Sequence, residues 1–145
     1  MIVADTGAIV ALLDADDRHH HTLVELFDRT GSSWVLPWAI LPEVDYLAAR
    51  HGGVEAAAVF VADLSEGAWT VEWGDPADLA TAHDLLSRYA DLRLGLVDAV
   101  VMATAERLHA EAIVTLDVRD FGAVALKGEP RLLPRDEEQR PPTGC

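Results

Sequence analysis

Residues 95–117, GLVDAVVMATAERLHAEAIVTLD, contain the pattern that decides the fold. The pattern predicts a helix from Val97 to about His109, and the apolar, β-branched run Ala112–Leu116 predicts a buried strand. The helix spans about 18 Å at 1.5 Å per residue, and the strand returns about 17 Å at 3.3 Å per residue. Asp98 and Asp117, which lie 19 residues apart, are therefore expected at the same end of the domain.

The N-terminal residues 1–13, MIVADTGAIVALL, show the same two patterns in the opposite order. Ile2–Asp5 predicts a short buried strand, and Thr6–Leu13 predicts a helix with an apolar face. Asp5 thus lies between two segments that both favour burial. In open parallel α/β sheets, ligands bind beyond the carboxyl ends of the strands. We therefore expect Asp5 to mark the functional edge of the sheet.

The rest of the chain continues to alternate between helical and strand patterns. Helices are predicted over residues 19–29, 39–52, 54–64 and 75–89, and strands over residues 34–36 and 69–73, with minor edge strands at 123–126 and 131–133. Short apolar strands alternating with helices predict an α/β fold, in which a mainly parallel sheet forms the centre of a three-layer α/β/α domain. Residues 135–145 are charged and Pro-rich, which predicts a disordered C-terminal tail after a domain of residues 1–134.

Composition limits the classes of protein that need considering. The 145 residues fit one domain, and half of them are hydrophobic, so a real core is expected. The single cysteine, Cys145, excludes a disulfide framework and fits a reducing cytosol. Because Asp5 and Asp14 interrupt the N-terminal apolar stretch, we expect neither a signal peptide nor a membrane span. The net charge of −14 argues against nonspecific binding to a phosphate backbone and suits divalent cations or a basic partner.

Further acids are expected at the edge that holds Asp5. Glu43 lies in the first turn of the helix that follows the strand at residues 34–36, and Asp120 lies three residues after Asp117. Carboxylates gathered in one place repel each other unless a cation holds them. A set of oxygen ligands favours Mg²⁺ or Mn²⁺. The hydroxyls of Thr6 and Thr115 are expected near the same edge, where they could orient a carboxylate or a water.

Simpler interpretations apply to each feature alone. An Asp near a strand end is most often a helix cap or a surface group, although the convergence of four acids weakens that interpretation. Arg93 and Arg119 lie near the expected edge and are candidates for phosphate contacts, with ordinary solvated charge as the equal alternative. His19, His20 and His21 are consecutive on a helix and point in different directions, so we expect a surface helix start and no metal site.

Four segments together resemble a known family. IVADTGAIVALL, LPEVDYLAAR, LGLVDAVVMATAERL and IVTLDVRDF resemble, in order, the sequence blocks of PIN-domain ribonucleases, and in particular the VapC toxins of bacterial toxin–antitoxin pairs. The resemblance covers about residues 1–134. One departure is Gly7, where members of the family more often have Ser.

This resemblance implies a cytoplasmic, Mg²⁺-dependent endoribonuclease, in which Mn²⁺ substitutes, that cleaves transfer RNA or the sarcin–ricin loop of ribosomal RNA. It implies a homodimer and a cognate VapB-type antitoxin, with no membrane partner. The catalytic acids would be Asp5, Glu43, Asp98 and Asp117. Asp5, Asp98 and Asp117 would bind the metal, with Glu43 and Asp120 as further candidates. Thr6 and Thr115 would be supporting hydroxyls.

Three alternatives remain open. The same acids could serve a DNA or flap nuclease, although the short chain has no obvious helical arch or DNA-binding module. A catalytically silent PIN domain could act as a protein-interaction module, but such a domain would be expected to lose acids, and all four are present. A purely structural acidic domain predicts that Asp98→Asn leaves metal binding unchanged.

Overall fold

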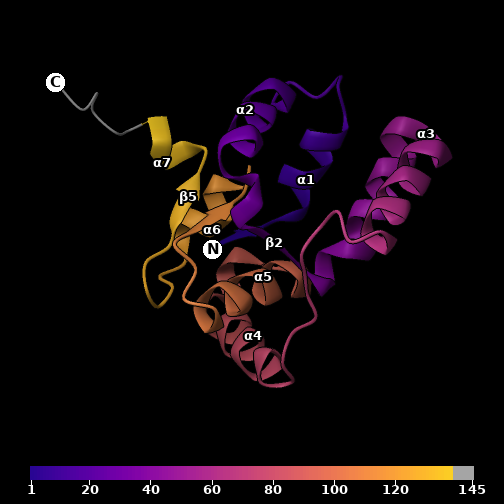
Figure 1. The fold of residues 1–145 in the computed structure, drawn as a ribbon. Coiled ribbons are helices and arrows are strands. Elements are labelled where there is room, and N and C mark those ends of the chain that lie inside the picture. The colour runs from indigo at the N-terminus through magenta and orange to yellow at the C-terminus, as the bar shows by residue number, and fades with distance from the viewer. Residues whose placement is uncertain (139–145) are drawn as a thin grey trace, which may run out of the picture.

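The computed structural model describes residues 1–138 and shows a five-stranded sheet between two layers of helices (Figure 1). The strand order is β3-β2-β1-β4-β5, and every neighbouring pair is parallel. The strands are Ile2–Ala4 (β1), Trp34–Pro37 (β2), Val71–Glu72 (β3), Ala112–Val114 (β4) and Arg131–Leu133 (β5). The predicted α/β/α class is confirmed, and the sheet is parallel throughout.

Helices cover both faces of the sheet. The bounds are Thr6–Leu13 (α1), His20–Thr30 (α2), Leu41–Ser65 (α3), Ala77–Arg88 (α4), Leu96–Arg107 (α5), Val118–Ala123 (α6) and Arg135–Glu138 (α7). On one side α1 packs against α2 and α3, and on the other α4 packs against α5, which contacts β1 and β2 (Figure 1). Short 3₁₀ helices occupy Gly31–Ser33, Trp38–Ile40 and Ala90–Leu92. Within the described residues, no helix combines the length and the hydropathy that crossing a bilayer requires.

The central strands form because both of their faces are covered. Each residue of β1 and β4 is at most 3% exposed. Strands buried on both faces favour continuous apolar runs without alternation, which is the pattern that predicted them. The predicted strand at residues 69–73 is shorter in the structure, because only Val71–Glu72 pairs with β2. Trp69 instead packs against the rings of Phe27 and Phe60.

Helix α3 contains a break where the sequence predicts one helix to end and another to begin. Gly53 has φ 85° and ψ 172°, a backbone conformation that is open to glycine and strained for other residues. Pro42 lies in the first turn of α3, where its missing N–H costs no intrahelical bond. The two predicted helices therefore exist as the two halves of α3.

The prediction of an edge strand over residues 123–126 is wrong. Ala123 ends α6, and Val124 and Leu126 are buried while Ala125 is exposed. This alternation is typical of a strand, but the edge of β4 is already paired with β5. The segment therefore packs against the core without entering the sheet.

The predicted disordered tail begins too early, because Arg135–Glu138 form the short helix α7. Asp136 Oδ2 accepts a hydrogen bond from the Leu132 N–H (2.7 Å), and Arg29 pairs with Glu137 (2.6 Å). These contacts tie α7 to β5 and α2, which the charged composition alone did not indicate. The remainder of the predicted tail, residues 139–145, lies outside the described residues.

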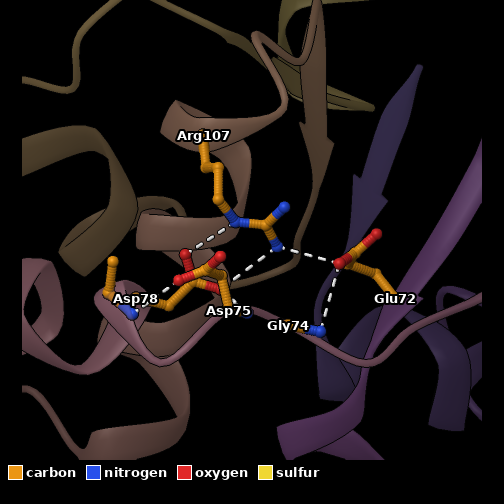
Figure 2. A network of polar contacts seen from close by, with 6 residues as sticks. Glu72, Gly74, Asp75, Asp78 and Arg107 are labelled. Carbon is orange, nitrogen blue, oxygen red and sulfur yellow. Dashed lines mark hydrogen bonds and ion pairs between the residues drawn. The ribbon is translucent and has the colours of Figure 1, made fainter.

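Arg107, at the end of α5, joins three elements through a polar network (Figure 2). Its Nε donates to Asp78 Oδ1 (2.7 Å), and its Nη2 donates to Asp78 Oδ2 (3.1 Å) and Glu72 Oε1 (2.9 Å). The Asp78 carboxylate also accepts from the Asp75 N–H (3.1 Å), and Glu72 accepts from the Gly74 N–H (3.1 Å). Hydrogen bonds to Asp78 and Glu72 raise the pKa of Arg107 further above its ordinary range. The network fixes α4 and β3 against the end of α5.

Candidate active site

Asp5 lies at the corner between β1 and α1, where the sequence predicts it, and is only 6% exposed. The Thr6 N–H donates to its Oδ1 (2.8 Å), and the Thr115 hydroxyl donates to its Oδ2 (2.9 Å). Its own N–H donates to the Val114 carbonyl (2.9 Å), which ties the corner to β4. Both carboxylate oxygens are held in place, and each retains capacity to bind a ligand.

Thr115 connects Asp5 to the next acid in the site. It is fully buried at the end of β4, and its Oγ1 accepts a hydrogen bond from the Asp117 N–H (3.0 Å). Asp117 caps α6, because its Oδ1 accepts from the Asp120 N–H (3.1 Å). One hydroxyl therefore sets the position of the Asp5 carboxylate relative to the start of α6.

Asp98 is the third residue of α5 and is half-buried. Its Oδ2 accepts a weak hydrogen bond from the Gly95 N–H (3.3 Å), so the carboxylate partly caps the helix. The capping interpretation of Asp98 thus holds, but it accounts for only one of the two oxygens. Gly95 was missed as a site residue; its position three residues before Asp98 is the spacing of a capping box, which could have identified it.

The acids of this edge influence one another electrostatically. Burial raises the pKa of Asp98, and the nearby charges of Asp117, Glu43 and Asp120 raise it further, against the hydrogen bond from Gly95. The charges of Asp117, Glu43 and Asp120 are therefore close enough to Asp98 to affect its pKa. Glu43 lies in the first turn of α3, as predicted, and its side chain is exposed. The structure therefore brings together the acids that the sequence selected, while their catalytic role stays a prediction.

Asp5 is the most strongly perturbed acid of this group. Burial raises its pKa from 3.8 to about 6, with smaller contributions from the charges of Asp98 and Asp117. The hydrogen bonds from Thr115 and Thr6 oppose this rise in pKa. A buried carboxylate that is repelled by its neighbours favours a proton or a cation as its partner.

The donor set fits Mg²⁺ or Mn²⁺ in kind, since all the candidate ligands are carboxylate oxygens. Among the described residues, no three His, Cys, Asp or Glu side chains are placed close enough to form a ready metal cage. Mg²⁺ does not need one, because it retains several waters and uses one or two carboxylates with substrate phosphates. Asp5, Asp98 and Asp117 could hold the ion, and Glu43 and Asp120 are further candidate ligands.

Three further residues were predicted at this edge: Thr6, Arg93 and Arg119. The Thr6 hydroxyl oxygen is buried beside Asp5 and has no hydrogen-bond partner among the described residues, so it is available to a water or ligand. Arg93 lies two residues before Gly95 and Arg119 two residues after Asp117, and both are exposed. These arginines are close to the acids in the sequence, and their contact with RNA stays a prediction.

The three consecutive histidines make separate contacts at the start of α2. His20 contacts the Ala11 carbonyl (2.9 Å), and His21 pairs with Glu25 (3.1 Å). His19 accepts a hydrogen bond from Arg18 (3.1 Å). The prediction of a surface helix start is confirmed.

A parallel sheet between helical layers, with acids from four segments at its carboxyl edge, defines the class of the protein as an α/β/α domain. The family model for the PIN domain matches residues 2–127, and the chain belongs to this family as a VapC-type member. It is 32% identical over 123 residues to Ribonuclease VapC26 of Mycobacterium tuberculosis (strain ATCC 25618 / H37Rv), a match that covers 85% of this chain and 91% of that protein.

Solved structures share the fold. One is the crystal structure of Mycobacterium tuberculosis VapC20, which is described as a sarcin–ricin loop cleaving toxin. It matches with a TM-score of 0.74 and 24% identity, and the match covers 88% of this chain and 98% of the VapC20 chain. A DNA-bound VapBC complex from Salmonella typhimurium has a TM-score of 0.68 and 18% identity, covering 90% and 95% of the two chains. At these identities the likeness establishes the architecture alone.

Proposed function

We propose that this protein is a Mg²⁺-dependent endoribonuclease, that it is the toxin of a type II toxin–antitoxin pair, and that it acts in the cytoplasm. The relationship to Ribonuclease VapC26 supports ribonuclease activity. The proposed target is a structured RNA, either transfer RNA or the sarcin–ricin loop, and the structural neighbour VapC20 is described as cleaving the latter. The proposed catalytic acids are Asp5, Glu43, Asp98 and Asp117.

The observation that carries this proposal is that Asp5 is a buried acid with a raised pKa. It is buried, its pKa is raised to about 6, and the charges of Asp98 and Asp117 contribute to the rise. Among the described residues, the ion pairs of the chain include none of the five acids at this edge. A divalent cation would supply the missing positive charge.

The chain's residues have distinct roles in hydrolysis. Mg²⁺, when bound, polarises the phosphodiester and makes a bound water more acidic. Asp5, Asp98 and Asp117 would hold the cation, and Thr115 keeps one Asp5 oxygen fixed. Asp117 or Asp5 orients the attacking water and accepts its proton. The water oxygen bonds to phosphorus opposite the leaving 3′-oxygen, and the P–O3′ bond breaks. The leaving 3′-oxygen takes a proton from solvent water, so the products are a 5′-phosphate and a 3′-hydroxyl.

Cleavage of total bacterial RNA by the purified protein, free of antitoxin, tests the proposal. We expect discrete cuts in Mg²⁺ or Mn²⁺ that EDTA abolishes. Asp98→Asn is expected to reduce the rate at least about 100-fold, because it removes a charge that holds the cation at the reacting phosphate. Mapping the cut ends identifies the target.

Cuts that persist in EDTA would contradict the metal-dependent mechanism. The absence of cuts from folded protein in either metal would favour the protein-interaction module. Equal cleavage of matched RNA and DNA stem-loops would favour the alternative of a DNA or flap nuclease.

The Thr115 hydroxyl provides a second test of the same site. Thr115→Val removes the donor to Asp5 and the acceptor of the Asp117 N–H. Because the groups that orient metal ligands typically account for 10- to 100-fold in affinity, we expect Mn²⁺ binding to weaken about 10-fold in calorimetric titration. Thr104→Val is the matched control, since the Thr104 hydroxyl is equally buried and has no hydrogen-bond partner among the described residues. Equal reductions in Mn²⁺ affinity in the two variants would contradict a positioning role for Thr115.

We also propose a VapB-type antitoxin partner and a homodimer. VapBC complexes from two bacteria each contain a chain with this fold, which supports the partner. A segment bearing Arg or Lys could pair with the carboxylates at the acidic edge and displace the cation. Co-expression with a candidate VapB-type antitoxin and light scattering of the purified complex would test both the partner and the homodimer.

A further inference from the structure

A pocket outside the candidate active site lies where β2 and β3 leave the sheet. Pro37, the last residue of β2, pairs in register with Glu72, the last residue of β3. A tryptophan follows each of these residues, so Trp38 and Trp73 leave the sheet side by side. The pocket, here called the tryptophan pocket, has a volume of about 200 Å³ and is lined by Trp38, Trp73, Gly74, Asp75, Pro76, Asp78 and Leu79.

Gly74 holds the loop of this pocket against Trp38. Its φ of 86° is in the left-handed region that favours glycine. A Cβ atom at this position would lie 2.7 Å from Trp38 Nε1 and 2.9 Å from Trp38 Cδ1. The Trp38 ring has little room to move away, because it packs against a small apolar cluster of α4 and α5. The backbone between Trp73 and Asp75 therefore lies directly against the Trp38 ring.

Hydrogen bonds fix the acidic side of the pocket (Figure 2). The Asp75 N–H donates to Asp78 Oδ2 (3.1 Å), and Asp75 Oδ1 accepts from the Ala77 N–H (2.8 Å). The Asp75 side chain is exposed and forms no ion pair with any described residue. Its Oδ2 is therefore available to a ligand, on a loop whose conformation is already set.

The charge at the pocket is negative. The network of Glu72, Asp75, Asp78 and Arg107 contains three carboxylates and one guanidinium, which leaves an excess of negative charge. The whole chain has a net charge of the same sign, −14. Such surroundings repel a phosphate group and attract a cation. A nucleotide is therefore a poorer ligand for this pocket than a basic group.

The aromatic side of the pocket favours the same kind of ligand. Trp73 is 74% exposed and Leu79 is 51% exposed. Single apolar residues on a surface are ordinary, but these two line one pocket together with a second tryptophan. The face of an indole ring carries partial negative charge and attracts cations. Tryptophan is also a residue that carries much of the binding energy at protein interfaces.

We propose that the tryptophan pocket binds an arginine side chain of a partner polypeptide. The guanidinium group is planar, so it stacks on an indole ring while its N–H groups donate to the Asp75 carboxylate. A residue next to that arginine in the partner covers Leu79 and the rim of Trp73, which a small guanidinium compound leaves exposed. None of the five acids of the candidate active site lines this pocket, so its occupancy does not depend on the proposed ribonuclease function.

An NMR titration of the indole N–H resonances tests the proposal. The chain has four tryptophans, and Trp38→Phe and Trp73→Phe assign the two resonances of the pocket. The ¹⁵N-labelled full chain is titrated with the capped peptide Gly-Arg-Leu-Gly and with the matched peptide Gly-Gln-Leu-Gly. Free L-arginine and adenosine monophosphate are titrated separately, the first as a small guanidinium compound and the second as a base.

We expect the arginine peptide to shift the Trp38 and Trp73 resonances with a dissociation constant on the order of 1 mM. The glutamine peptide and adenosine monophosphate should leave them unchanged, and free L-arginine should bind about 3-fold more weakly than the arginine peptide. Asp75→Asn keeps an acceptor for the Ala77 N–H and removes the charge, so it should weaken binding about 3-fold. Trp73→Ala, followed on the Trp38 resonance, should weaken binding about 5-fold or more.

Two matched controls change similar groups elsewhere on the surface. Asp16→Asn changes an exposed acid in a loop, and Tyr46→Ala changes an exposed aromatic residue on α3. Both should bind the arginine peptide as the wild type does. If the controls weaken binding as much as Asp75→Asn and Trp73→Ala, the peptide follows overall charge and the proposal is wrong.

Other occupants of the pocket give different results. Equal shifts with the arginine and glutamine peptides would show a purely apolar site and overturn the proposal. A response to adenosine monophosphate without one to the arginine peptide would show a base-stacking site and overturn it as well. Shifts caused by concentrating the protein alone, with a doubled mass in sedimentation, would show a contact between two copies in place of the arginine site.

Discussion

Asp5→Asn is expected to abolish RNA cleavage and at the same time to stabilise the metal-free domain. Asn has the shape of Asp and can accept from the Thr6 N–H while donating to Thr115 Oγ1, so both contacts of the buried side chain survive. The substitution removes a charge that is buried and repelled by its neighbours. It also removes a proposed metal ligand, which should reduce cleavage about 1,000-fold.

The gain in stability depends on pH, and the pKa of Asp5 sets its sign. The folded pKa of about 6 lies above the ordinary value of 3.8, so the folded state holds the proton more tightly than the unfolded state. The contribution of Asp5 to stability is fully present below about pH 4 and is lost as the pH rises through 6. At pH 7.5 the ionised group costs up to about 3 kcal/mol, since each pKa unit corresponds to about 1.4 kcal/mol.

Urea unfolding in EDTA measures this effect. We expect Asp5→Asn to raise the free energy of unfolding at pH 7.5 by about 2–3 kcal/mol and to have little effect at pH 4. Asp16→Asn, which changes an exposed acid in a loop, is the control and should shift stability by less than about 0.5 kcal/mol. A loss of stability in Asp5→Asn at pH 7.5 would show that the Asp5 charge is compensated in the folded protein.

Arg107→Met is expected to produce the largest loss of stability. Asp78 is 4% exposed and accepts two hydrogen bonds from Arg107, so the variant leaves a buried carboxylate without its partner (Figure 2). Breaking a buried pair from one side typically costs 3–5 kcal/mol. Because Arg107 is partly exposed, we expect the lower end, about 3 kcal/mol, in urea unfolding at pH 7.5.

Two further variants separate the charge effect from the effect of packing. Arg88→Met removes the exposed i,i+4 pair with Asp84 and should cost less than about 0.5 kcal/mol. Adding Asp78→Asn to Arg107→Met removes the stranded charge and should recover about half of the stability that Arg107→Met removes. If the double variant is as unstable as Arg107→Met, the cost comes from lost packing, and the prediction that the unpaired Asp78 charge causes it is wrong.

The sequence by itself determined the architecture and the edge where the acids lie. The apolar strands, the helical periodicity and the matched lengths of residues 95–117 are local features, and a parallel sheet leaves little freedom in connecting them. The positions of Asp5, Asp98 and Asp117 at the carboxyl ends of strands and at helix starts follow from that order. The two halves of α3 were likewise predictable, because glycine marks the break.

Only the tertiary structure decided the contacts between distant segments. Thr115 and Asp5 are 110 residues apart, and their hydrogen bond exists because β1 and β4 are neighbours in the sheet. The hydrogen bond between Arg107 and Asp78 likewise joins two distant segments. The tertiary structure also decided that β5 pairs with β4, although the alternating pattern of residues 123–126 is equally typical of an edge strand. Burial, pKa and pairing depend on the surroundings of a group in space, and a periodic pattern reports only the face on which a residue lies.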